Sequence, residues 1–420
     1  MNSNENTQRE VSELDKQEFV SKLTIKNDSK ILMLIMDGLG GVPKVGGKTE
    51  LEAANTPNMD MLALASDLGQ TVPVIPGITP GSGPGHLGLF GYDPIKYQIG
   101  RGILEALGIG LEVSNKDVVA RGNFATIRDG IIVDRRAGRP ATEENAKVCE
   151  LINSKISEID GVKVQVFPGK EHRFVLKLTG DGLDDKLTDA DPQRDGEPIE
   201  YAKALSKNSE KTAKIVNEFM DRVINLLKDG EKISGCLLRG FSKYPGLPLF
   251  PEVYKIKSAA IATYPMYRGL AKLVGMDVLE VPSAEGELET IRAEIKVLKA
   301  NYDKYDFFYF HVKHTDSYGE DSNFMAKVDV IETVDKVIPE ILSLKPDVVV
   351  ITGDHSTPSV VGGHSWHPVP FLIYSKYSRY GLSSSFNEKE CARGSLGTIE
   401  ARDLMTLLLA NAMRLEKYGA

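Results

Sequence analysis

The chain has 420 residues, of which 41% are hydrophobic and 26% are charged, and its formal net charge is −8 at pH 7. This length and composition predict a globular protein of two or three domains with sizeable buried cores. The acidic balance argues against a nucleic-acid partner, because phosphate backbones are bound by basic surfaces.

The N-terminal residues carry no targeting or membrane signal. The apolar run at 31–36 is far shorter than the roughly 20 residues of a membrane-spanning helix, and the first thirty residues are polar and charged instead of signal-like. We therefore predict a polar leader at 1–28, with one helix from Ser12 to Leu23, no membrane partner and a cytoplasmic location. Three scattered cysteines form no C-x-x-C pair, so we expect them to be buried apolar residues rather than disulfide or zinc ligands: Cys149, Cys236 and Cys391.

The first ordered element after the leader is an apolar run from Ile31 to Met36, which ends at Asp37 and Gly38. A continuous apolar run of this length predicts a strand that is buried on both faces. An acidic residue then follows the carboxyl end of that strand.

A glycine-rich peptide, TPGSGPGHLGLFGYDP at 79–94, places the hydroxyl of Ser82 ahead of an apolar stretch. Glycines let the backbone turn sharply and approach an anion, and a helix after Ser82 would direct its free N–H groups at whatever the hydroxyl attacks. Such a turn is more often structural than catalytic, so the peptide by itself decides nothing.

The middle of the chain has a different pattern of predicted strands and helices. Strand patterns occur at 118–127, 163–167, 174–178 and 235–238, and a helical pattern runs from Tyr201 to Leu227. We predict a smaller α+β domain at 112–255, inserted into a first domain that is formed by 29–111 and 256–420.

The last third repeats the design of the first strand. Apolar runs at 307–312 and 348–352 lead into His314-Thr315-Asp316 and Gly353-Asp354-His355, and helical patterns occur at 285–300, 324–344 and 404–414. This alternation predicts an α/β domain with a mostly parallel sheet flanked by helices. Ligands bind beyond the carboxyl ends of the strands in such sheets.

Six of the seven histidines fall in three short segments, 79–94, 311–321 and 351–368. Carboxylates, imidazoles and a serine at adjacent strand ends suit a pair of divalent cations, which can stabilise both oxygens of an in-line phosphoryl transfer. Each residue also has a structural interpretation. Asp37-Gly38 could form a turn, Asp354 a helix cap, and Asp316 with Glu320 a solvated helix face. Their joint occurrence favours the metal site.

These residues resemble a known family. Asp37-Gly38, the PGSGPGH peptide around Ser82, GDHSTP at 353–358 and GGHSWHPVP at 362–370 are similar to the cofactor-independent phosphoglycerate mutases, the archaeal-type branch of the alkaline phosphatase superfamily. The middle segment resembles the same family, through RGNFAT at 121–126, DRRAGR at 134–139, HRF at 172–174 and TDADP at 188–192.

The resemblance implies an alkaline phosphatase-like fold and an isomerase of glycolysis and gluconeogenesis. This enzyme would interconvert 3-phosphoglycerate and 2-phosphoglycerate through a phosphoserine at Ser82, without bisphosphoglycerate. By the same resemblance, one cation would be bound by Asp37, Ser82, Asp354 and His355, and the other by Asp316, Glu320 and His364.

Two positions depart from the family pattern. Relatives usually have histidine where this chain has Glu320, and commonly also where it has Gln193. Glutamate is a harder donor than imidazole, which favours manganese or magnesium over zinc or cobalt.

The resemblance also implies a set of basic residues for the phosphorylated carboxylate substrate, because guanidinium groups bind carboxylate and phosphate oxygens in bidentate pairs. They are Arg121, Arg135, Arg136, Arg139, His172, Arg173, Arg268 and Lys313. If the arginines come from the inserted domain and the cations lie in the first, the substrate would be bound at the interface, and closure of the two domains would exclude water from the phosphoserine.

Several alternatives stay open at this point. A metal-dependent phosphatase or phosphodiesterase would use the same serine and cations with water as the final acceptor, and a silent relative would only bind phosphorylated metabolites. His86 would orient the Ser82 loop or pack beneath it, while His311 and His367 would orient metal ligands or be structural. The sequence predicts no particular oligomeric state.

Overall fold

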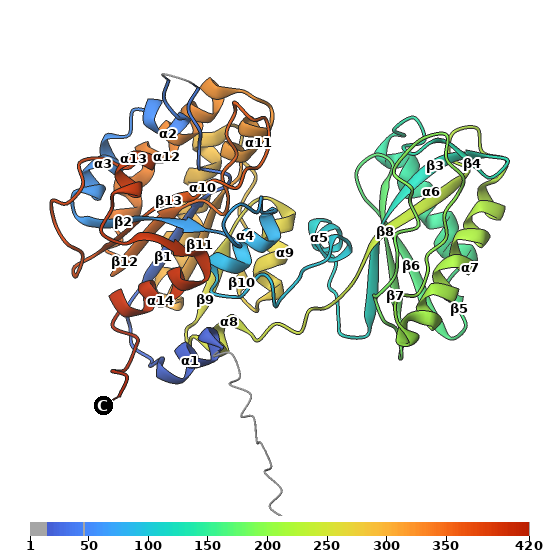
Figure 1. Cartoon of the computed structure of the whole chain (residues 1–420), viewed down its shortest axis with the longest axis horizontal. Helices are drawn as coiled ribbons and strands as arrows, with labels where there is room; N and C mark the ends of the chain where they lie inside the picture. Colours follow the sequence, from blue (N-terminus) through green and yellow to red (C-terminus); the bar gives the residue numbers. More distant parts are fainter. Residues whose placement is uncertain (1–14, 45–46, 420) are drawn as a thin grey trace, which may run out of the picture.

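The computed structural model describes residues 15–44 and 47–419, which form two β-sheets (Figure 1). The larger sheet has eight strands in the order β10-β9-β11-β1-β12-β13-β2-β14. All of these except β13 run in the same direction, which confirms the predicted mostly parallel sheet. The strands are β1 (Ile31–Met36), β2 (Ser66–Val72), β9 (Ser258–Ile261), β10 (Asp277–Val278), β11 (Phe307–Val312), β12 (Val348–Thr352), β13 (Val369–Ser375) and β14 (Gly397–Glu400).

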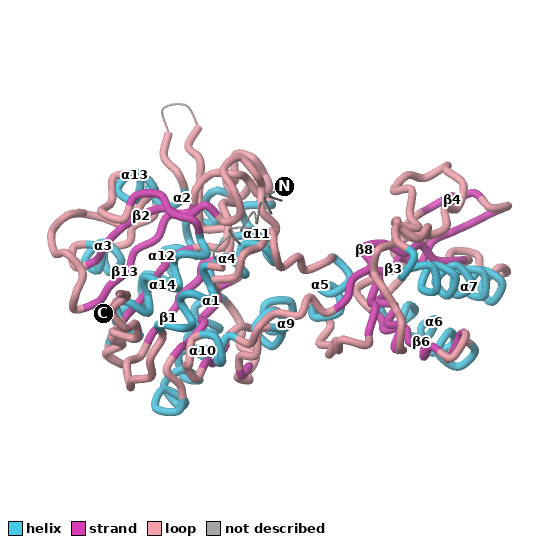
Figure 2. Tube along the Cα trace, turned by 60° about the horizontal axis from the view of Figure 1, so that its bottom comes forward, coloured by secondary structure: helices cyan, strands magenta, loops and turns pink. Residues whose placement is uncertain are grey.

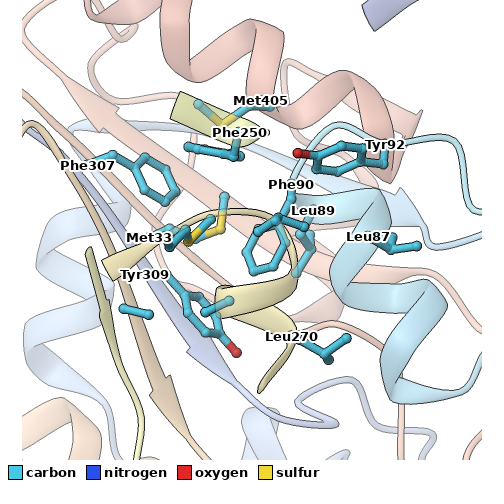
Figure 3. Close-up of a cluster of buried hydrophobic side chains, with 14 of the residues drawn as sticks. Met33, Leu87, Leu89, Phe90, Tyr92, Phe250, Leu270, Phe307, Tyr309 and Met405 are labelled. Carbon is cyan, nitrogen blue, oxygen red and sulfur yellow. The ribbon is translucent and has the colours of Figure 1, made fainter. Parts of the chain in front are cut away.

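The central strands are apolar throughout because successive side chains point into two different cores. Ile31, Met33 and Ile35 face one core, and the intervening residues of β1 face the other. The strands predicted at 31–36, 307–312 and 348–352 are therefore confirmed with their bounds. Figure 3 shows the first core, where Met33 of β1 and Tyr309 of β11 lie near Leu89 and Phe90.

Helices cover both faces of this sheet. The first core is covered by α1 (Lys16–Leu23), α4 (Ser82–Leu89), α5 (Arg101–Gly108), α8 (Phe250–Val253), α9 (Pro265–Leu273) and α14 (Ala401–Asn411). The second is covered by α2 (Glu50–Ala53), α3 (Pro57–Ala63), α10 (Glu287–Asn301), α12 (Phe324–Leu342) and α13 (Glu388–Ala392). A short helix, α11 (His314–Glu320), follows the carboxyl end of β11.

The second sheet takes all its strands from the middle of the chain and has its own hydrophobic core. Its order is β4-β3-β7-β6-β5, and β8 pairs with β3. All four predicted strands are present. Three extend one residue beyond their pattern at each end, and the fourth continues from 238 to Lys243, while the domain bounds themselves stay a prediction. The elements are β3 (Asp117–Arg128), β4 (Ile131–Asp134), α6 (Thr142–Lys155), β5 (Glu158–Ile159), β6 (Val162–Pro168), β7 (Arg173–Thr179), α7 (Glu210–Leu227) and β8 (Gly235–Lys243).

The helix predicted from Tyr201 begins later than its pattern. Residues 207–209 form a 3₁₀ turn, and α7 starts only at Glu210. The side chain of Asn217 binds both backbone groups of Ala202 (2.9 and 3.0 Å), which holds the preceding segment in an extended path. The prediction was wrong for 201–209 because a tertiary contact from α7 itself overrides the local helical pattern.

The terminal helices are also shifted from their patterns. Asp15 caps α1, so the described part of the leader helix begins at Lys16, and the predicted residues 12–14 lie outside the described residues. The last helix runs over Ala401–Asn411 instead of 404–414, because Met413 has φ +54° and turns the chain away. The buried Arg414 then binds the carbonyl oxygens of Asn27 and Ser29.

Helix α5 connects the two sheets (Figure 2). Its Gly102 lies so close to the second sheet that a β-carbon there would come within 2.5 Å of the carbonyl oxygen of Val119. On the other side, a β-carbon at Gly269 of α9 would lie 2.3 Å from Leu107. Ile103 of α5 shares one core with Val119 and Val175, so the contact between the sheets is apolar.

All three cysteines are free and buried, as predicted. Among the described residues, no helix combines the length and the apolar character that crossing a membrane requires.

Candidate functional site

Three neighbouring strands of the larger sheet, β11, β1 and β12, end at the same edge and carry polar side chains there. Asp37, Asp354 and His355 form one group, and Asp316, His355 and His364 form another. Within each group, one ligand atom per residue lies within 4.8 Å of the others. The structure thus brings together five of the predicted metal-site residues, with His355 in both groups.

The carboxylates of the first group are buried, and three of their four oxygens accept no hydrogen bond, although Lys313 lies 3.0 Å from Asp37 and His86 lies 3.1 Å from Asp354. These three are both oxygens of Asp37 and Oδ2 of Asp354, whose side chains are fully buried. Burying such a group costs several kcal/mol unless a cation compensates for it. Burial raises the pKa of Asp37, but His311, Lys313 and His355 outweigh it and hold this pKa well below its usual range. Free carboxylate oxygens that remain charged are suitable ligands for a divalent cation.

Hydrogen bonds fix the tautomer of His355. The hydroxyl of Thr357 donates to Asp316 Oδ1 (2.7 Å), so it accepts from Nδ1 of His355 (2.9 Å). Nε2 is then unprotonated, and it lies 3.4 Å from Asp37, 3.2 Å from Asp354 and 3.4 Å from Ser82 Oγ. Burial lowers the pKa of His355 despite the adjacent carboxylates, which keeps this nitrogen available as a ligand.

Ser82 is the first residue of α4, as the glycine-rich peptide predicts. Its half-buried side chain lies where the free N–H groups of the helix begin. Gly85 permits this position, because a β-carbon there would lie 2.5 Å from the carbonyl oxygen of Asp354. The close approach of α4 to the end of β12 is what brings the serine to the first group.

The second group is more open. His364 donates from Nδ1 to the carbonyl oxygen of Pro80 (2.9 Å), and its Nε2 lies 3.4 Å from Asp316 and 3.7 Å from Glu320. Burial lowers the pKa of His364, but Asp316 and the Pro80 carbonyl outweigh it and raise this pKa to about 9. The side chain of Glu320 is 54% exposed, so this residue lies at the rim of the group instead of inside it.

His86 and Lys313 connect the groups to their surroundings. His86 approaches both the carbonyl oxygen of Ser82 (2.9 Å) and Oδ2 of Asp354 (3.1 Å), so it orients the serine loop as well as packing beneath it. Lys313 lies between the groups, 3.0 Å from Asp37 and paired with Asp316. In contrast, His367 contacts Ser365 and stacks on Trp366.

Tyr267 of α9 also lies at the site and was not predicted from the sequence. Its ring stacks on His311 with 3.9 Å between centroids, and Lys313 lies above it. Its hydroxyl is buried without a hydrogen-bond partner. Since α9 lies outside the three strand ends, no motif signal could have identified this residue.

The second sheet carries a group of arginines. Arg121 of β3 lies directly opposite Arg239 of β8, and Arg173 of β7 is also near Arg121. Like charges in register across two strands are destabilising. Burial and the neighbouring arginines outweigh Glu105 and lower the pKa of Arg121 to about 10. This arrangement suits an anion. Arg239 was missed because only the strand register brings it to Arg121.

The other predicted basic residues have different environments. Arg135 forms a bidentate pair with the buried Asp191 (3.0 and 2.7 Å), while Arg136 and Arg139 are exposed. Arg268 pairs with Glu280 instead of joining the arginines of the second sheet. Gln193, the second departure, accepts a hydrogen bond from Arg239 at 3.1 Å.

The chain is similar over nearly its whole length to proteins of one family. A family model described as 2,3-bisphosphoglycerate-independent phosphoglycerate mutase matches residues 63–232. A protein of Thermotoga sp. (strain RQ2), named "Probable 2,3-bisphosphoglycerate-independent phosphoglycerate mutase", is 66% identical over 97% of this chain and 100% of its own length. The chain belongs to the 2,3-bisphosphoglycerate-independent phosphoglycerate mutase family. The expectation of an isomerase is thereby confirmed at the level of this family.

Other members of the family are less identical but are similar over nearly the whole chain. A protein of the same name from Thermus thermophilus is 53% identical over 96% of this chain and 98% of its own. A solved structure, the cofactor-independent phosphoglycerate mutase of Thermoplasma acidophilum, has a TM-score of 0.74 and 30% identity, with 91% of this chain and 100% of that chain covered. Both sheets of the mutase fold are thus included in the similarity.

The arginine group predicts an unusual titration. Burial and the adjacent Arg173 lower the pKa of His172 to about 4, whereas the exposed His314 has a raised pKa because of Glu287. In an NMR titration of the substrate-free protein with labelled histidine, we expect the His172 signal to stay constant from about pH 5.5 to about pH 8. The His314 signal should shift with a midpoint above that of a free histidine. A His172→Asn variant assigns the signal, and a midpoint near that of a free histidine for His172 would contradict this account.

Proposed function

We propose that this chain interconverts 3-phosphoglycerate and 2-phosphoglycerate by transferring the phosphoryl group to Ser82 and back at a two-metal site. The observation that carries the proposal is the position of Ser82 at the start of α4, beside two carboxylate and histidine groups that share His355. The family to which the chain belongs supports the choice of phosphoglycerate as the substrate.

The donor set fits divalent cations, as the unpartnered oxygens of Asp37 and Asp354 indicate. Asp37, Ser82, Asp354 and His355 would hold one ion, and Asp316, Glu320 and His364 the other. When bound, the ions supply the positive charge that stabilises the attacking and leaving oxygens. A set rich in carboxylates favours manganese or magnesium, with cobalt or zinc as weaker candidates.

The side chains of the protein divide the remaining work. Ser82 Oγ forms the bond to phosphorus as the bond to the substrate oxygen breaks, and the group then returns to the other hydroxyl of the glycerate. The start of α4 and Lys313 place positive charge beside the transferred oxygens. His86 holds the Ser82 carbonyl, which keeps the nucleophile in place.

Arg121, Arg173 and Arg239 would bind the glycerate carboxylate, because their charges oppose one another until an anion separates them. Closure of the arginine sheet over the serine, with α5 as the joint, would hold the glycerate and exclude water. Retention of the glycerate distinguishes a mutase from a phosphatase, in which water accepts the phosphoryl group.

The assay that tests this function incubates the purified protein with 3-phosphoglycerate and manganese and follows the products by ³¹P NMR. We expect 2-phosphoglycerate without free phosphate, and a loss of about a thousandfold or more in Ser82→Ala, because the nucleophile is removed. Ser154→Ala, on an exposed position of α6, is the matched control. Release of phosphate alone would identify a phosphatase and overturn the proposal.

Glu320 predicts the metal preference. Replacing Glu320 by histidine exchanges a hard oxygen for an imidazole at the rim of the second group, so activity with zinc or cobalt should rise several-fold relative to manganese. Glu320→Gln is the control, because it removes the charge and supplies no imidazole. The measurement is kcat/KM with each metal, and an unchanged preference in Glu320→His would show that residue 320 does not contact the ion.

A further inference from the structure

Lys327 of α12 is a fully buried lysine beneath the metal groups. Its ammonium donates to the carbonyl oxygens of Gly38 (2.8 Å), Thr357 (2.8 Å) and Gly40 (3.3 Å). All three of its N–H bonds therefore go to backbone carbonyls of two loops. These are the loops that follow β1 and β12.

Each loop held by Lys327 carries residues of the site. Gly38 follows Asp37 and donates its N–H to Asp354 Oδ1 (3.1 Å). The hydroxyl of Thr357 connects His355 to Asp316. The backbone of Thr357 also bonds to the carbonyls of Gly38 (3.2 Å) and Gly40 (3.0 Å). The lysine thus connects the segments that carry both metal groups without contacting a ligand atom.

The loops after β1 and β12 are closely packed against each other and against α11. A β-carbon at Gly38 would lie 2.4 Å from Thr357 Oγ1 and 2.8 Å from Asp316 Oδ1, and one at Gly40 would lie 1.9 Å from Ser356 Oγ. A shift of either loop would therefore displace the oxygen and nitrogen atoms of both groups. Three charge-assisted hydrogen bonds from one buried ammonium are suited to prevent such a shift.

Two carboxylates near Lys327 partly balance its charge. Burial lowers the pKa of Lys327, while the neighbouring carboxylates of Glu50 and Glu388 raise it. These carboxylates brace the same loops, since Glu388 accepts from Gly41 N (2.9 Å) and Glu50 from Ser359 N (2.8 Å). Burying a charged lysine is a costly way to stabilise a fold, because apolar residues of similar volume often do so better. The contacts of Lys327 therefore indicate that it fixes the positions of the loops after β1 and β12.

We propose that Lys327 is a positioning residue, which sets the spacing of the two metal groups by fixing the loops after β1 and β12. This inference rests on the proposed two-metal function. Outer contacts that orient metal ligands typically change metal affinity by about 10- to 100-fold when they are removed. Because Lys327 does not touch the arginine sheet, its removal should leave substrate recognition unchanged.

The test compares the Lys327→Met variant with the wild type, both as full-length proteins. Methionine fills the same volume without charge or donors, and Lys336→Met on the exposed side of α12 is the matched control. Manganese binding is measured by isothermal titration calorimetry without substrate, on protein whose folded state is verified by circular dichroism. We expect Lys327→Met to bind manganese about tenfold or more weakly. At saturating manganese, kcat should fall while KM for 3-phosphoglycerate stays within about twofold, and Lys336→Met should match the wild type.

Lys327→Gln, which keeps N–H donors on a shorter neutral side chain, should bind manganese with intermediate affinity. If Lys327→Met is folded and binds manganese like the wild type, the proposal is overturned and the lysine is only structural. If neither variant folds, the proposal is also overturned, because the lysine is then needed for the fold itself. A wild-type protein that binds no manganese would instead contradict the two-metal function, which separates the two failures.

Discussion

The buried negative charge at the ends of three parallel strands is the constraint on which the rest of the site depends. Asp37 and Asp354 are fully buried, and three of their oxygens accept no hydrogen bond, although Lys313 and His86 lie 3.0 and 3.1 Å away. A further cation would stabilise such buried charge. The hydrogen bond through Thr357 leaves Nε2 of His355 free, and Lys313 balances part of the charge. Together these features favour the binding of positive charge beside Ser82.

The second sheet carries an excess of positive charge. Arg121 and Arg239 lie in register across two strands, and this positive charge is only partly balanced. One half of the molecule therefore concentrates negative charge and the other concentrates positive charge. In the proposed function, cations would balance the first and a phosphorylated carboxylate the second. Helix α5, packed by Gly102 against one sheet and by Leu107 against the other half, is the natural joint for such an encounter.

The sequence predicts the central strands because burial on both faces leaves an unbroken apolar run, and it predicts their polar ends because parallel strands share one edge. It does not predict β2, whose residues Ser66–Val72 mix polar and apolar side chains, or the antiparallel direction of β13. Arg239, Tyr267 and Lys327 were missed for a related reason. Each lies in no local motif, and only strand register or helix packing brings it to the site.

The central claim is that Ser82 carries the phosphoryl group between the two positions of glycerate. The most direct measurement is an acid quench of the manganese-loaded protein during turnover of 3-phosphoglycerate, followed by mass spectrometry of the peptide that contains residues 79–94. We expect one added phosphoryl group on Ser82, present only with substrate and metal. Steady turnover to 2-phosphoglycerate with an unmodified Ser82, or with the phosphoryl group on another residue, would contradict it.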